Sequence, residues 1–274
     1  GEVDTIQELG NSYSYGIAVD TSGYIYYTLN DSLFKVHSSA PGTVLASNSF
    51  PSTYTDFYNR IYSDGSALYL FGIRDNYWAG MVSVSPTDLS LNWGDYPQMP
   101  EAHLVDMLDR DGSIYAIWAP FEVNSGSYFR TNRVDKLTGT ELWYSTVSMG
   151  QAHQGALSMD MNSNGDLYLT GYQGQASNFV PANWAVAKIS GATGELIFHE
   201  RITLDSTQED DLSWGKGACV IGDQPFFVGE MQTSNGSLSN TGPQSTPYLV
   251  KVDPMNGAVE RMSAFGGAYR FPSR

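Results

Sequence analysis

The chain is poor in cysteine, in positive charge and in long apolar runs. Its one cysteine in 274 residues, Cys219, cannot form a disulfide within the chain and excludes a metal site built from several thiolates. No segment approaches the roughly 18 consecutive apolar residues that a membrane-spanning helix needs, so we expect no membrane insertion. These absences predict a fold held together by packing.

Positive charge is outnumbered two to one. Lysine and arginine total 14 against 29 aspartates and glutamates, which gives a formal net charge of -15. A field of this sign repels phosphate backbones and anionic lipid surfaces, so nucleic acid is excluded as an expected partner. The simplest meaning of the charge is a solvated acidic surface.

Helical periodicity is missing as well. What the chain has instead is 28 glycines, 18 tyrosines and 41% hydrophobic residues, arranged as short apolar clusters between polar turns. This pattern predicts an all-β protein with enough apolar material for a sizeable core.

The short strands recur as a repeat with recognisable anchors. A turn glycine followed by an apolar strand with a central aromatic residue appears five times, from Gly23, Gly65, Gly112, Gly165 and Gly222. A second strand follows each time, with the dipeptides Lys35-Val36, Ser83-Val84, Arg133-Val134, Lys188-Ile189 and Lys251-Val252. One strand before and one after complete a unit of four strands.

Four-stranded units that recur every 40 to 60 residues or so are typical of a β-propeller, with one unit per blade. The sequence therefore predicts a single propeller domain with five complete repeats, approximately 11–54, 55–99, 100–149, 150–205 and 206–267. Residues 1–10, "GEVDTIQELG", copy the outer strand "GAVERMSAFG" of the last repeat. They are predicted to be a surplus outer strand, either closing the ring or belonging to a longer propeller.

The repeat pattern DxxGxIYxxG…xxKVDxxxGxxLWxxxxG is carried best by Asp160 to Ile202. It resembles the extracytoplasmic propeller repeats of bacteria and archaea known as SBBP-type or PQQ-like repeats. The resemblance implies an exported protein, whether secreted, periplasmic or at the cell surface, with a binding or scaffolding role. It also reaches quinoprotein dehydrogenases, which makes PQQ a possible cofactor, although no residue set matches a PQQ site position by position.

Candidate ligand-binding residues precede the first strand of each blade, because propeller ligands usually sit over the ends of these strands. Two blades share a motif there, Glu101-Ala102-His103 and Gln151-Ala152-His153. The corresponding positions elsewhere hold Tyr13, Tyr15, Asp56, Asp210, Asp211 and Trp214. Together these side chains fit either a divalent cation or a sugar stacked on an aromatic ring. The alternative is that both histidines only cap strands by bonding backbone carbonyls.

A calcium-loop opening, D-x-N-x-N-G, is spelled by Asp160, Asn162, Asn164 and Gly165. Gly171 stands where such a loop needs its closing acidic residue, at the twelfth position. Asparagine before glycine is also what a tight hairpin turn requires, and this interpretation is the stronger one.

Three functions follow from these features. The favoured one is a non-catalytic extracytoplasmic module that binds a protein or a glycan through loops on one face. Long segments between second and third strands, 172–184 and 231–248, support it. The alternatives are a polysaccharide-acting or quinone-dependent propeller enzyme, and a structural subunit of a surface layer that self-associates through its terminal strands.

Overall fold

The computed structural model describes most of the chain. The described residues are 16–29, 32–50, 57–74, 78–100, 102–120, 129–147, 153–174, 181–202, 212–233, 244–265 and 269–270. The predicted surplus strand at residues 1–10 lies outside them and stays a prediction. Within them every regular element is a β-strand.

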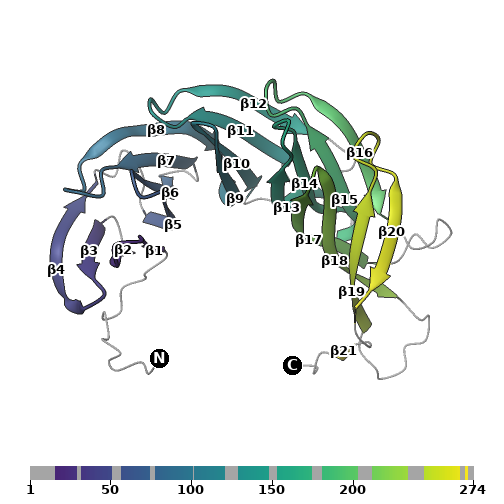
Figure 1. Ribbon diagram of the computed structural model, residues 1–274, viewed down its shortest axis with the longest axis horizontal. Helices are drawn as coiled ribbons and strands as arrows, with labels where there is room; N and C mark the ends of the chain where they lie inside the picture. Colours follow the sequence, from purple (N-terminus) through teal and green to yellow (C-terminus); the bar gives the residue numbers. More distant parts are fainter. Residues whose placement is uncertain are drawn as a thin grey trace. The chain divides into compact units, whose positions relative to one another are not determined.

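The strands form five antiparallel sheets, each built from four strands in sequence order (Figure 1). We call these sheets blades 1 to 5.

Blade 1 contains β1 (Ile17–Val19), β2 (Tyr24–Leu29), β3 (Ser32–His37) and β4 (Ala40–Ser49). Blade 2 contains β5 (Phe57–Ser63), β6 (Leu68–Arg74), β7 (Trp78–Val84) and β8 (Leu91–Pro100). Blade 3 contains β9 (Ala102–Arg110), β10 (Ser113–Pro120), β11 (Phe129–Asp135) and β12 (Glu141–Val147). Blade 4 contains β13 (His153–Met161), β14 (Leu167–Gly174), β15 (Pro181–Ile189) and β16 (Leu196–Ile202). Blade 5 contains β17 (Leu212–Ile221), β18 (Gln224–Thr233), β19 (Gln244–Val252) and β20 (Val259–Ala264), and β21 (Tyr269–Arg270) also pairs with β19.

The predicted anchors fall where the repeat places them. All five anchor glycines end the turn between first and second strands with a positive φ, from 54° at Gly222 to 85° at Gly65. Glycine reaches this left-handed region without the steric cost that a Cβ imposes, so it suits the turn. The dipeptides of the second anchor all lie in third strands.

The chain divides into two compact units. The first comprises residues 1–104 with the turn 135–141, and the second comprises 105–134 with 142–274. The first unit thus holds blades 1 and 2 together with the turn between the last two strands of blade 3.

In the first unit, blades 1 and 2 pack face to face through an apolar layer. Blade 1 contributes Tyr26 and Leu33, and blade 2 contributes Leu68, Leu70 and Val82, all buried. The layer follows from strand alternation, because successive side chains point to opposite faces of a sheet.

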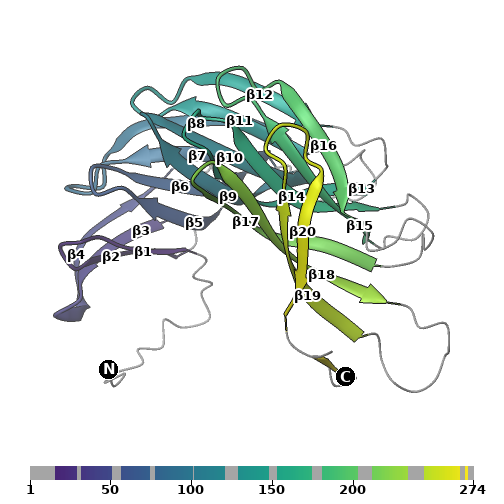
Figure 2. The same cartoon turned by 45° about the vertical axis from the view of Figure 1, so that its right-hand side comes forward.

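In the second unit, blade 4 is buried on both faces. Leu167 and Leu169 of β14 pack towards blade 3, whereas the intervening Tyr168 packs towards blade 5. Figure 2 shows β17 of blade 5 beside the strands of blade 4, and β17 contacts β13, β14 and β15. We call the face of a blade towards its predecessor the leading face, and the face towards its successor the trailing face.

Each pair of neighbouring blades is joined at the turn between third and fourth strands. The second residue of this turn presents its backbone carbonyl to the preceding blade. The donors are Lys35 and Tyr26 to Pro86, Trp93 to Lys136, Arg133 and Trp143 to Gly191, and Lys188 and Tyr168 to Pro254. The junction at Lys136 lies within the first unit, because the turn 135–141 belongs there.

A ring from the preceding blade lies against the glycine of the same turn. A Cβ built on Gly139 would meet the Trp93 ring at 2.7 Å, and one on Gly257 would meet the Phe198 ring at 2.5 Å. Trp143 lies against Gly194 in the same way. Glycine is therefore required twice over at these positions, by a positive φ and by the close ring.

Candidate functional site

The antiparallel strand order gives each blade two distinct ends. The turns between first and second and between third and fourth strands lie at one end, which we call the turn end. The segment before the first strand and the segment between second and third strands lie at the other, the loop end. The residues predicted to bind a ligand belong to the loop end.

Most of those predicted residues lie outside the described residues. This holds for Tyr13, Tyr15, Asp56, Glu101, Gln151, Asp210 and Asp211. His103 and His153 lie at the starts of β9 and β13, but their side chains are outside the description. Their grouping around a ligand therefore stays a prediction.

Trp214 is the predicted residue that the structure describes in full. It lies on β17, close to the loop end, and is partly exposed. The Lys216 ammonium lies 5.2 Å from the centroid of the Trp214 ring and 3.3 Å from a Glu230 carboxylate oxygen. The Lys216 side chain is half exposed. An indole, a cation and a carboxylate thus gather at the loop end of the trailing face of blade 5.

The neighbours of Trp214 explain why its side chain points to that face. The Ser213 hydroxyl oxygen accepts a hydrogen bond from the Trp184 amide of blade 4, at 2.7 Å. A Cβ on Gly215 would meet the Thr170 hydroxyl at 1.9 Å, so this position has no room for a side chain. With both neighbours held against blade 4, strand alternation directs Trp214 away from it.

The calcium-like turn in blade 4 uses its side chains for the fold. The Asp160 carboxylate accepts the amides of Met161 and, at 2.6 Å, of Val220 in blade 5. The Asn162 side-chain oxygen accepts the Asp166 amide across the turn, at 2.8 Å. Asn164 is exposed. These contacts fit the turn interpretation, and no group of three metal-ligating His, Cys, Asp or Glu side chains occurs among the described residues.

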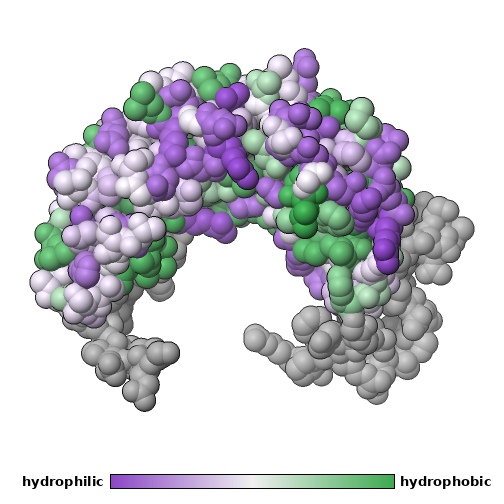
Figure 3. Space-filling model, in the orientation of Figure 1, coloured by the Kyte–Doolittle hydropathy of each residue, from purple (hydrophilic) through white to green (hydrophobic). Residues whose placement is uncertain are grey.

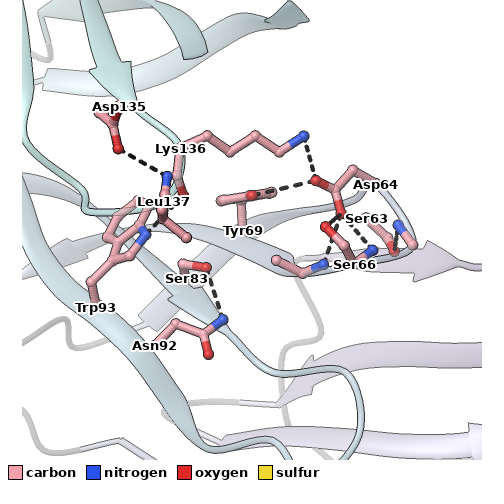
Figure 4. Close-up of polar contacts among 12 residues, drawn as sticks. Ser63, Asp64, Ser66, Tyr69, Ser83, Asn92, Trp93, Asp135, Lys136 and Leu137 are labelled. Carbon is pink, nitrogen blue, oxygen red and sulfur yellow. Dashed lines mark hydrogen bonds and ion pairs between the residues drawn. The ribbon is translucent and has the colours of Figure 1, made fainter. Parts of the chain in front are cut away.

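A second polar cluster lies at the turn end of blade 2, where no site was predicted (Figure 4). The Lys136 ammonium reaches the Asp64 carboxylate at 2.5 Å, and the Tyr69 hydroxyl donates to the same carboxylate. Asp64 also accepts the amides of Ser66 and Ala67, both at 2.7 Å. Its side chain is only 7% exposed.

This environment shifts the Asp64 carboxyl strongly. Burial favours the neutral acid, but the Lys136 ammonium and the amides of Ala67 and Ser66 outweigh it and lower the pKa of Asp64 to about 2. The cluster is therefore an ion pair over the ordinary pH range. The Trp93 indole also donates to the Lys136 carbonyl, at 3.0 Å, so the cluster belongs to a blade junction.

The sequence carries a signal for this cluster that repeat reasoning can read. Three blades place a cation in the third strand, at Lys35, Arg133 and Lys188, whereas blade 2 has Ser83 there. The missing cation reappears as Lys136, in the turn that packs on blade 2. Pairing each repeat with the next one, rather than stacking repeats singly, would reveal it.

Comparisons with known proteins give the fold. The sequence matches no family model and no curated protein. Among solved structures, the chain is similar to quinohemoprotein alcohol dehydrogenase ADHIIG from Pseudomonas putida HK5, with a TM-score of 0.55 and 13% identity over 93% of this chain and 44% of that chain. It is also similar to a chain of the mitotic checkpoint complex, with a TM-score of 0.54 and 7% identity over 92% of this chain and 64% of that one.

The chain spans less than half the length of the dehydrogenase chain that it matches. At these identities the likeness concerns the fold alone. None of the helices in the described residues is long and apolar enough to cross a membrane. Five sheets of four antiparallel strands and propeller neighbours confirm the fold predicted from the repeat: the chain is a β-propeller.

Proposed function

We propose that this chain is a non-catalytic extracytoplasmic propeller module that binds a protein or a glycan through the loop end of its blades. The observation that carries the proposal is the cluster of Trp214, Lys216 and Glu230. A partly exposed indole beside a donor and an acceptor is the composition with which proteins bind sugars and anchor partners. The turn end, by contrast, spends its polar groups on blade junctions.

The charge of the chain narrows the choice of partner. A net charge of -15 repels polyanions, so an acidic polysaccharide is disfavoured. The Trp214 indole offers an apolar surface, and Lys216 and Glu230 offer hydrogen bonds that do not depend on a charged ligand. Of the two partner classes, these groups favour a neutral glycan.

Binding to an array of neutral and acidic glycans tests the proposal. We expect saturable binding to neutral glycans that Trp214→Ala weakens at least tenfold, because the aromatic surface is removed. Tyr144→Ala is the matched control, since Tyr144 is an exposed aromatic residue on β12, 45% exposed, away from the cluster. The control variant should bind like the parent chain.

Assays of turnover separate this function from the enzyme alternative. Release of reducing ends from a bound glycan, or quinone-dependent oxidation of an alcohol, contradicts a non-catalytic module. Binding that Trp214→Ala leaves unchanged contradicts the site. Binding restricted to surface proteins and lost in Trp214→Ala supports the module and assigns it the protein partner.

A further inference from the structure

Blade 1 exposes apolar residues at positions that are buried in an interior blade. Val19 pairs with Ile25 as Met161 pairs with Leu167 in blade 4, so the two positions are equivalent. Val19 is 61% exposed, whereas Met161 is 7% exposed under blade 3. Ile17 is likewise 67% exposed. The leading face of blade 1 therefore has the residues of a blade junction with no blade packed on them.

The trailing face of blade 5 shows the complementary half. Cys219 pairs with Phe226 as Asp160 pairs with Tyr168 in blade 4, and Cys219 is exposed. Ile221 and Val228 of the same face are 66% and 44% exposed. Figure 3 shows hydrophobic surface over β17 and β18, and separately over β1.

The junction donor is also present on blade 5. Lys251 pairs with Phe226 as Lys188 pairs with Tyr168. In blade 4 the Lys188 ammonium donates to the Pro254 carbonyl of the next blade, at 3.1 Å. The Lys251 ammonium instead meets Glu260 of its own blade, and both side chains are more than one-third exposed. Blade 5 thus keeps the cation of a junction without the carbonyl that receives it.

We infer that the chain associates head to tail with a second copy of itself, the trailing face of blade 5 receiving the leading face of blade 1 of that copy. The occupant follows from the register, because each face repeats one half of the junction between blades 4 and 5, and one chain carries both halves. Two different faces meet in such a contact, so association continues into a ring or a filament instead of stopping at a dimer.

The known junction also predicts which residues meet. In the junction of blades 4 and 5, the Val220 amide donates to the Asp160 carboxylate. Val19 and Cys219 occupy the equivalent positions of the two exposed faces. In the assembly Val19 of one copy therefore lies against Cys219 of the next.

The loop end stays accessible in this arrangement. Tyr172 of blade 4 stands at the register position of Glu230 and is only partly buried beside blade 5. The inference goes beyond the proposed function, and association and ligand binding can succeed or fail separately.

Oxidative cross-linking tests the contact, because the chain has a single cysteine. The variant Val19→Cys carries one thiol on each face, and mild oxidation should link it into a ladder of dimers, trimers and larger species. Val19→Cys with Cys219→Ser, mixed with the parent chain, should give dimers of one copy each and nothing larger. Adding Ile221→Asp, at an exposed position of the trailing face, should abolish the ladder.

Leu137→Cys is the matched control, since Leu137 is 86% exposed in a turn away from both faces and reports random collision. We expect Val19→Cys to link at least tenfold faster than this control. Added salt should strengthen the association, because it screens the repulsion between copies that each carry a charge of -15. Equal rates for the two variants, or a parent chain that sediments only as a 30.0 kDa monomer at low and high salt, overturn the inference.

Discussion

The junction between blades 1 and 2 and the junction between blades 4 and 5 fill the same space in opposite ways. Blade 4 supplies a large ring, Phe198, and blade 5 answers with Gly257 at a φ of 77°. Blade 1 has Ala46 at the register position of Phe198, and blade 2 answers with Leu89. Leu89 takes the same left-handed turn position, with φ at 61°, and is fully buried against Ala46.

The comparison shows that volume is conserved across the junction, not within the repeat. A left-handed conformation is costly for leucine, and burial of its side chain in the gap left by Ala46 offsets that cost. The cation follows the same logic, because Lys136 replaces the lysine that blade 2 lacks at Ser83. A deviation from the repeat in one blade is thus matched by a deviation in the next.

The largest expected effect comes from filling the glycine side of the ring junction. Gly257→Ala places a Cβ against the Phe198 ring in a left-handed conformation, and we expect the free energy of unfolding to fall by about 3 kcal/mol. Gly222→Ala is the matched control, because Gly222 also has a positive φ but nothing within 4 Å of the added atom. It should cost only about 1 kcal/mol. Urea unfolding measures both, and equal losses would mean that the ring plays no part.

A smaller effect is expected from moving the cation. Lys136→Ala leaves the buried Asp64 carboxylate without its ion pair, and should cost about 2 kcal/mol. Adding Ser83→Lys returns the cation to the third strand, where Lys35 and Lys188 have it, and should recover roughly half of the loss. Lys216→Ala, which breaks a more exposed pair, serves as the control and should change stability by less than about 0.5 kcal/mol. Failure of Ser83→Lys to recover stability would contradict the exchange.

The smallest effect concerns pH. Because the pKa of Asp64 is lowered to about 2, its ionised form stabilises the fold above the ordinary aspartate pKa of about 4. This contribution is lost as the pH falls from about 4 to about 2. The stability difference between the parent chain and Asp64→Asn should therefore shrink over that interval, as measured by unfolding at a series of pH values. A difference that is constant with pH would remove Asp64 from this role.

The fold could be predicted from the sequence because its determinants are local. The turn glycines and the apolar alternation of each unit, as around Gly165 and Tyr168, fix strands and turns within about ten residues. The five-fold recurrence then identifies the propeller.

The candidate site was less predictable because its determinants are not local. That Trp214 faces away from blade 4 depends on Ser213 and Gly215 meeting residues some 30 to 45 positions earlier in the chain. The Asp64 cluster depends on Lys136 of another repeat. The remaining predicted residues precede the first strands, where no repeat pattern constrains the chain.

The most direct test of conserved junction volume is a double-mutant cycle that turns the junction of blades 4 and 5 into that of blades 1 and 2. Unfolding free energies are measured for Phe198→Ala, for Gly257→Leu and for the double variant. The account predicts that the double variant is more stable than the sum of the single losses by more than about 1 kcal/mol, because leucine fills the space that the ring leaves. Losses that add within about 0.5 kcal/mol would contradict it.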